Sequence, residues 1–168
     1  MQGEVTVFIT RASSQTTPPV SHVEYEVRND TTVPIWLVND GWLIWKQEGS
    51  QIELSYARGT MRPGSHVFGY FSPTVVQIDP GQHLSLAANL SWPYRLDLLW
   101  NAERSAAPLP GNYQISVRVG YGLTPTPEDP GLNESVEAPV LRWQKEAVSQ
   151  PAPITVPSYQ QERDEDTK

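Results

Sequence analysis

An alternation of apolar and polar residues at every second position is the feature that most constrains the fold of this chain. It is clearest over residues 113–121, where Tyr, Ile and Val stand at the odd positions. Residues 5–9 and 23–27 repeat the pattern with Val, Ile and Tyr. Because successive side chains of a β-strand point to opposite faces, this period predicts half-buried strands with one apolar and one wet face.

Turn sequences divide the chain into short segments. Asn-Asp-Gly at 39–41 and Asp-Pro-Gly at 79–81 are typical of tight turns. The first turn is expected to join residues 35–38 to residues 42–45 as a hairpin. The best helix candidate is confined to residues 97–104. About nine short strands with almost no helix predict an all-β fold, built as a two-sheet antiparallel sandwich with long loops.

The length of 168 residues suits one domain. We expect a single β-sandwich domain over 1–156. Residues 157–168 are expected to form a disordered acidic tail, because they carry Gln, Glu and Asp without an apolar period. The last strand, over 150–156, is expected at a sheet edge, since Pro151 and Pro153 cannot donate to a ladder of backbone hydrogen bonds.

The charge balance excludes some classes of partner. Twelve Lys and Arg stand against 19 Asp and Glu, a net charge of −7. Binding to nucleic acid depends on basic groups that contact phosphates, and anionic membrane surfaces also attract basic segments. We therefore expect neither as a partner, and a partner protein would be neutral or basic. No apolar run approaches the length of a spanning helix, so no transmembrane segment is expected.

The chain has no cysteine, which excludes disulfides, thiol nucleophiles and Cys-ligated metals. Its first residues have neither the basic nor the apolar region of a signal peptide. We expect a soluble protein, and both a cytoplasmic protein and a mature exported domain fit the sequence. The glycosylation triplets at Asn29, Asn89 and Asn133 are expected to be chance matches.

Several segments resemble parts of a known scaffold. Residues 25–37 are similar to the passage from strand B to strand C, and residues 78–86 to the start of strand E, of bacterial immunoglobulin-like and fibronectin-III-like domains. The Pro-Gly-x-Tyr sequence at 110–113 resembles the start of strand F, and 149–156 resembles strand G. The resemblance implies an immunoglobulin-like sandwich in which Tyr113 contacts the upstream backbone. Over the B–C and E–F segments the chain is also similar to the intracellular proteinase inhibitor family, although no inhibitory loop is identified.

No catalytic motif is present. The chain lacks a Gly-x-Ser-x-Gly elbow and a phosphate-binding glycine loop, and its three His residues lack the spacing of metal ligands. His22 and Glu24 share the wet face of a strand and are expected to form a solvated pair. We expect no enzyme activity, catalytic residue, metal site or cofactor. One alternative remains, a hydrolase whose site is assembled across strands from His66, His83 and Asp79.

Six Trp and seven Tyr are the unusual feature of the composition. Trp36 and Trp100 are expected in the core. Trp92, in the sequence Trp-Pro-Tyr, is either a plug beneath a loop or an exposed contact. Exposed aromatic rings suit both protein interfaces and sugar faces. The residues expected to bind a partner or ligand are Trp42, Tyr70, Trp92 and Tyr94.

The sequence favours a non-enzymatic protein-binding or accessory module, such as an envelope subunit, an inhibitor or an immunity-type protein. Rigid sandwiches carry function on their loops, here expected at 59–74, 101–111 and 122–138. The first alternative is a carbohydrate-binding module in which Trp42, Trp92 and Tyr94 form a stacking platform.

Overall fold

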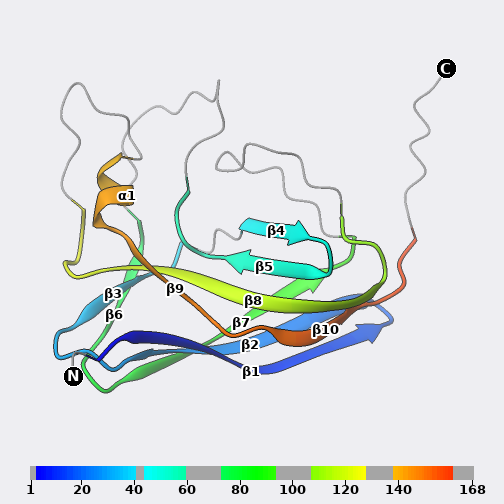
Figure 1. The fold of residues 1–168 in the computed structure, drawn as a ribbon, viewed down its shortest axis with the longest axis horizontal. Helices are drawn as coiled ribbons and strands as arrows, with labels where there is room; N and C mark the ends of the chain where they lie inside the picture. Colours follow the sequence, from blue (N-terminus) through cyan, green and yellow to red (C-terminus); the bar gives the residue numbers. More distant parts are fainter. Residues whose placement is uncertain (1–2, 41–43, 60–72, 94–106, 128–137, 161–168) are drawn as a thin grey trace.

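The alternating segments form two β-sheets (Figure 1). The apolar faces of the two sheets meet in one core. The computed structural model describes residues 3–40, 44–59, 73–93, 107–127 and 138–160. The predicted all-β fold of two sheets is confirmed. The smaller sheet has the strand order β1-β2-β7, formed by β1 (Val5–Thr16), β2 (Pro19–Asn29) and β7 (His83–Ser91).

The larger sheet has seven strands in the order β4-β5-β8-β3-β6, with β9 and β10 also paired to β8. Its members are β3 (Ile35–Val38), β4 (Ile44–Glu48), β5 (Gln51–Ser55), β6 (Val75–Ile78), β8 (Gly111–Gly122), β9 (Lys145–Val148) and β10 (Ala152–Val156). The pairing of β5 with β8 is parallel, whereas the other pairs are antiparallel. The prediction of a purely antiparallel sandwich is therefore wrong at this pair.

The alternating segments supply the core as the sequence predicts. Val23, Tyr25 and Val27 of β2 are at most 4% exposed, and their polar neighbours face outward. Ile115 and Val117 of β8, on the other sheet, are 0% exposed. Removing such side chains from water stabilises the fold by about 1.5–3 kcal/mol each. The core therefore joins the centres of both sheets.

The predicted hairpin between β3 and β4 is absent. β3 pairs with β6 along one edge and with β8 along the other, so neither edge is left for β4. β4 instead pairs with β5 through a turn at Gly49, whose φ of +58° favours glycine. The carboxylate of Asp40 accepts hydrogen bonds from Arg58 Nε and from the Thr74 backbone N–H, both at 2.6 Å. Asp40 thus joins three separate segments.

The C-terminal part of the chain contains the short helix α1 (Ala138–Trp143) and β9, and it packs against the domain further than predicted. Pro157 is buried, and the Tyr159 hydroxyl donates to the Pro108 carbonyl at 2.6 Å, so the packed chain continues beyond 156. The rest of the predicted tail and the helix candidate at 97–104 lie outside the described residues. Within the described ranges, no helix has the length and hydropathy of a membrane span.

Candidate functional site

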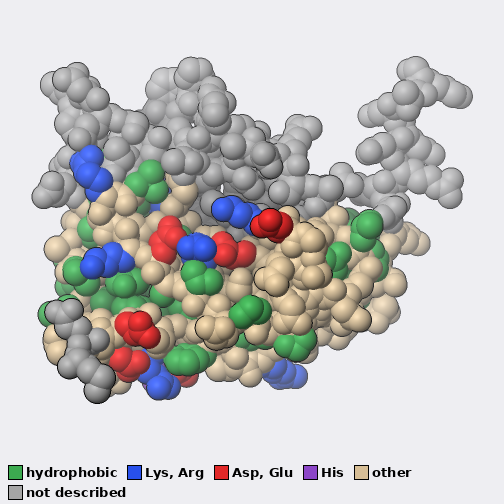
Figure 2. Space-filling model, in the orientation of Figure 1, with side chains coloured by type: hydrophobic (Ala, Val, Ile, Leu, Met, Phe, Trp, Pro, Cys, Tyr) green, Lys and Arg blue, Asp and Glu red, His purple; other side chains and the backbone are tan. Residues whose placement is uncertain are grey.

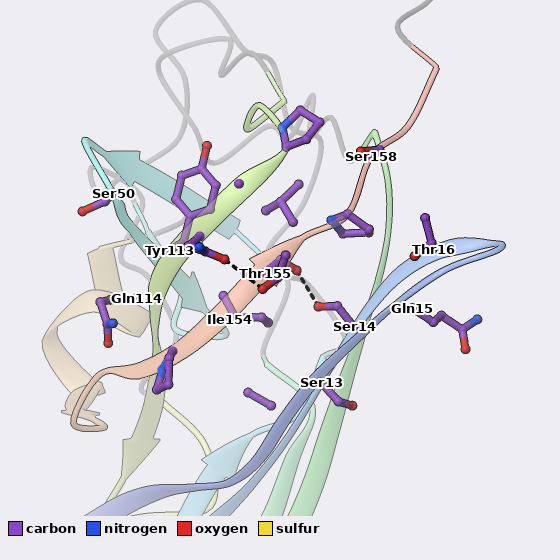
Figure 3. Close-up of a pocket in the computed structure, with 17 residues that line it drawn as sticks. Ser13, Ser14, Gln15, Thr16, Ser50, Tyr113, Gln114, Ile154, Thr155 and Ser158 are labelled. Carbon is purple, nitrogen blue, oxygen red and sulfur yellow. Dashed lines mark hydrogen bonds between the residues drawn. The ribbon is translucent and has the colours of Figure 1, made fainter.

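A groove with a volume of about 840 Å³ opens where the end of β1 lies beside β8 and β10 (Figure 3). Its lining comes from residues 12–16, Ser50, 110–114 and 153–158. None of these lining residues carries a charged side chain. In Figure 2 the charged side chains gather over the middle and left of the visible face. The right-hand end, where β8 begins and β10 ends, is mostly uncharged.

The groove exists because β10 cannot extend a backbone ladder toward β1. Thr155 directs its carbonyl away from β8, toward the serines of the smaller sheet. Residues two positions apart on a strand share this orientation, so Pro153 faces the same way, and Pro151 and Pro157 continue the alternation beyond the strand. Proline has no N–H to donate. Strands β1 and β10 therefore lie in contact without pairing, and the groove opens beside them.

Side chains replace the missing ladder between the two sheets. The hydroxyls of Ser14 and Ser21 donate to the Thr155 carbonyl at 2.5 and 3.1 Å. The Trp92 indole N–H donates to the Ser21 hydroxyl at 2.8 Å. The Thr155 hydroxyl in turn donates to Asn112 Oδ1 at 3.1 Å. One end of the groove is therefore held by a continuous chain of hydrogen bonds.

The lining determines which ligands the groove can hold. Ser, Thr, Asn and Gln side chains both donate and accept hydrogen bonds, and proline rings and one face of Tyr113 add apolar surface. The Tyr113 hydroxyl donates to the Leu109 carbonyl at 2.8 Å, which is the predicted contact with upstream backbone. The lining has no His, Asp, Glu or Lys that could serve as a general base. It suits a neutral ligand rich in amide or hydroxyl groups.

The structure corrects the prediction for Trp92. The side chain is 6% exposed, belongs to the core cluster and is hydrogen-bonded to Ser21, so it plugs the interior and is not an exposed contact. The other predicted binding residues, Trp42, Tyr70 and Tyr94, lie outside the described residues. Trp92 does not line the groove. The alternating prolines near the C-terminus and the hydroxyl-rich segment 13–16 are the sequence signals that could have located it.

Two of the three residues expected to form a hydrolase site, His83 and Asp79, are described, and each contacts a side chain outside that set. His83 Nε2 lies 3.8 Å from Glu26 Oε2, and Asp79 Oδ1 accepts a hydrogen bond from Gln77 at 2.7 Å. His66 lies outside the described residues. Among the residues that the structure describes, no group of three His, Asp or Glu side chains could hold a metal ion.

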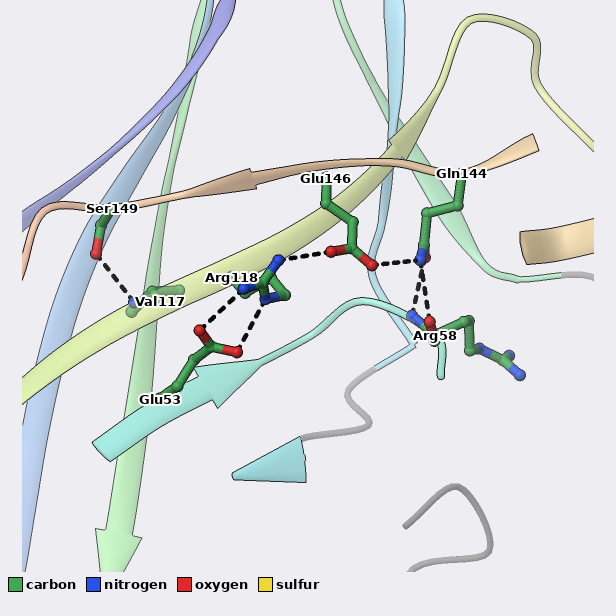
Figure 4. Close-up of polar contacts among 7 residues, drawn as sticks. All are labelled: Glu53, Arg58, Val117, Arg118, Gln144, Glu146 and Ser149. Atoms are coloured by element: carbon green, nitrogen blue, oxygen red, sulfur yellow. Dashed lines mark hydrogen bonds and ion pairs between the residues drawn. The ribbon is translucent and has the colours of Figure 1, made fainter. Parts of the chain in front are cut away.

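A polar network on the larger sheet has a structural role (Figure 4). Arg118 of β8 donates two hydrogen bonds to Glu53 of β5, at 2.9 and 3.1 Å, and one to Glu146 of β9 at 2.6 Å. These bonds, chiefly those to Glu53, raise the pKa of Arg118 above its usual value. The Gln144 side chain bonds both the N–H and the carbonyl of Arg58. The network fastens β5, β8 and β9 together.

His22 lies on the wet face of the smaller sheet, where the predicted pair with Glu24 is confirmed. Its Nδ1 faces Asn89 Oδ1 at 2.5 Å, and its Nε2 faces Glu24 Oε1 at 3.0 Å. Only the protonated ring can donate from both nitrogens. The hydrogen bond to Asn89, followed by that to Glu24, therefore raises the pKa of His22 above 6.5.

Asn89→Ala is expected to lower the pKa of His22 toward its ordinary value, as measured by NMR titration. A raised pKa stabilises the folded state below the unfolded pKa, and that contribution is lost as the pH rises through the folded pKa. The variant should therefore lose more stability relative to wild type at about pH 5.5 than at about pH 8. Ser91→Ala, on the same strand, is the control. An unchanged His22 pKa in Asn89→Ala would contradict the assignment.

Comparison of the chain with protein-family models, with curated proteins and with solved structures finds no match.

Proposed function

We propose that the protein is a non-enzymatic protein-binding or accessory module whose groove holds an extended, uncharged segment of a partner protein. The uncharged, hydroxyl- and amide-rich lining between β1, β8 and β10 is the observation that carries this proposal. Each peptide group of an extended segment offers one donor and one acceptor, which these side chains can satisfy. The scaffold is proposed to be immunoglobulin-like, supported by the contact between Tyr113 and Leu109.

The aromatic side chains favour a polypeptide over a sugar. A sugar platform needs exposed, coplanar rings. Every Tyr and Trp side chain whose burial the structure describes is buried or half-buried. Trp92, a member of the expected platform, lies in the core. A carbohydrate-binding module would therefore depend on Trp42 and Tyr94, which lie outside the described residues.

The proposal is tested by selecting binders from a library of random displayed peptides with the full chain. We expect the enriched peptides to be uncharged and to lose about tenfold in affinity, or about 1.4 kcal/mol, for Gln114→Lys. This exposed side chain lies in the groove lining, and its backbone bond to Ser50 is kept in the variant. The matched control is Gln77→Lys, an exposed position on β6, which should bind like the wild type.

Two results would contradict the proposal. Enriched peptides that bind both lysine variants equally would place the binding site elsewhere. A selection without enriched peptides, combined with glycan-array signals that are lost in Gln114→Lys, would assign the groove to carbohydrate.

A further inference from the structure

The outer edge of β7 is the longest unblocked sheet edge in the described part of the chain. β7 has nine residues and, among the described strands, pairs with β2 alone, in a continuous register without a bulge. It contains neither proline nor lysine, the residues that commonly protect edges. The other edges are interrupted or short. β10 carries Pro153, β1 has a bulge between Ile9 and Arg11, and β4 and β6 have five and four residues.

The register shows which backbone groups point out from this edge. The N–H groups of Trp92 and Asn29 donate to Pro19 and Gln82 at the two ends of the β2–β7 ladder, which places the even-numbered residues of β7 in hydrogen-bonded pairs with β2. The odd-numbered residues therefore direct their N–H and C=O groups outward. They are His83, Ser85, Ala87, Asn89 and Ser91. No described residue bonds to these backbone groups.

The side chains of β7 are compatible with a second copy of the same strand. With a two-fold axis at Ala87, antiparallel pairing sets Ser85 opposite Asn89 of the other copy, and Ala87 opposite itself. On the core side, Leu84 would meet Leu90. The half-buried leucines of β7 would then be covered, and no charged pair would be brought together, because His83 is the strand's one titratable side chain.

We propose that two copies of this chain pair through β7, antiparallel, about a two-fold axis at Ala87. The ladder would add about ten backbone hydrogen bonds, since five residues on each copy offer one donor and one acceptor. The net charge of −7 on each copy opposes this association, so added salt should strengthen it by screening. The surface is separate from the groove, so either proposal can fail without the other.

The test uses the absence of cysteine from the chain. Ala87→Cys introduces a single thiol on the two-fold axis, where hydrogen-bonded partners have Cα atoms about 5.5 Å apart, within disulfide range. The thiol of Ser91→Cys, on the same exposed face, would lie several residues along the strand from the equivalent thiol of the other copy. We expect mild oxidation to crosslink Ala87→Cys at least tenfold faster than Ser91→Cys.

Sedimentation velocity supplies a second measurement on the cysteine-free chain. We expect a dimer that dissociates on dilution and strengthens with salt, and a monomer for Ala87→Lys and for Ala87→Pro. Thr10→Lys introduces the same positive charge at an exposed position on β1, and this variant should remain dimeric. Equal crosslinking of the two cysteine variants, or a dimer that survives both Ala87 variants, would overturn the proposal. A wild-type chain that stays monomeric at about 0.1 mM would also overturn it and would leave the edge to a strand of another protein.

Discussion

Replacing Trp92 with alanine is expected to lower the free energy of unfolding by about 3–5 kcal/mol, measured by urea denaturation. The side chain is 6% exposed and packs in the core. Truncation would leave a cavity and remove the donor that bonds the Ser21 hydroxyl at 2.8 Å. Because Ser21 also bonds Thr155 of β10, the variant should loosen the contact between the two sheets beside the groove.

Two further variants separate the causes of this loss. Trp92→Phe keeps most of the apolar ring and removes the indole N–H, so it should cost about 1 kcal/mol for the hydrogen bond, in addition to its smaller volume. Phe8→Ala removes a side chain that is 46% exposed on the smaller sheet and should cost less than about 1 kcal/mol. If Trp92→Ala were as mild as Phe8→Ala, the burial of Trp92 would be contradicted.

Asn29→Ala is expected to cost about 2–4 kcal/mol of unfolding free energy, although it removes only a small polar group. Asn29 is 0% exposed. Its Nδ2 donates to the carbonyls of Val33 and Ile78 at 2.8 and 2.9 Å, and its Oδ1 accepts from the Thr31 N–H at 3.0 Å. Alanine would leave the buried Ile78 carbonyl and two partly buried backbone groups without these partners. Thermal and urea unfolding would both report the loss.

The conservative variant Asn29→Asp sharpens this prediction. At neutral pH it would set a carboxylate against the two carbonyls that Nδ2 now serves, so it should be at least as destabilising as alanine. Asn112→Ala, an exposed asparagine with one side-chain bond to Thr155, should cost less than about 0.5 kcal/mol. Equal effects at both asparagines would refute the assigned role. Because Asn29 is buried and already donates two hydrogen bonds, it is unsuited to glycosylation in the folded protein.

Local patterns were sufficient to locate several of the strands. The alternation over 23–27 and 113–121 located the core faces of β2 and β8, because side-chain direction along a strand depends only on position. The turn at 79–81, with Gly81 at a φ of +75°, follows from turn chemistry in the same way. Pro151 and Pro153 placed the last strand at an edge, because a missing N–H is a property of the residue.

The pairing of strands was decided by the tertiary structure. Asn-Asp-Gly at 39–41 has the residues of a hairpin turn, but β6 and β8 occupy both edges of β3, which leaves β4 to pair with β5. The parallel pairing of β5 with β8 likewise joins segments separated by β6 and β7. Strand pairing depends on which edges remain free, and that is a property of the whole sheet.

In the candidate site, too, some features follow from the local sequence and others from the tertiary structure. The sequence by itself determined an uncharged, hydroxyl-rich segment at 13–16 and a proline-rich last strand. Only the tertiary structure showed that these two segments lie together and enclose a groove. Only the tertiary structure showed that Trp92, a possible surface contact by sequence, is buried in the core. The physical reason is that residue chemistry is local, whereas burial and juxtaposition arise from contacts between segments far apart in the chain.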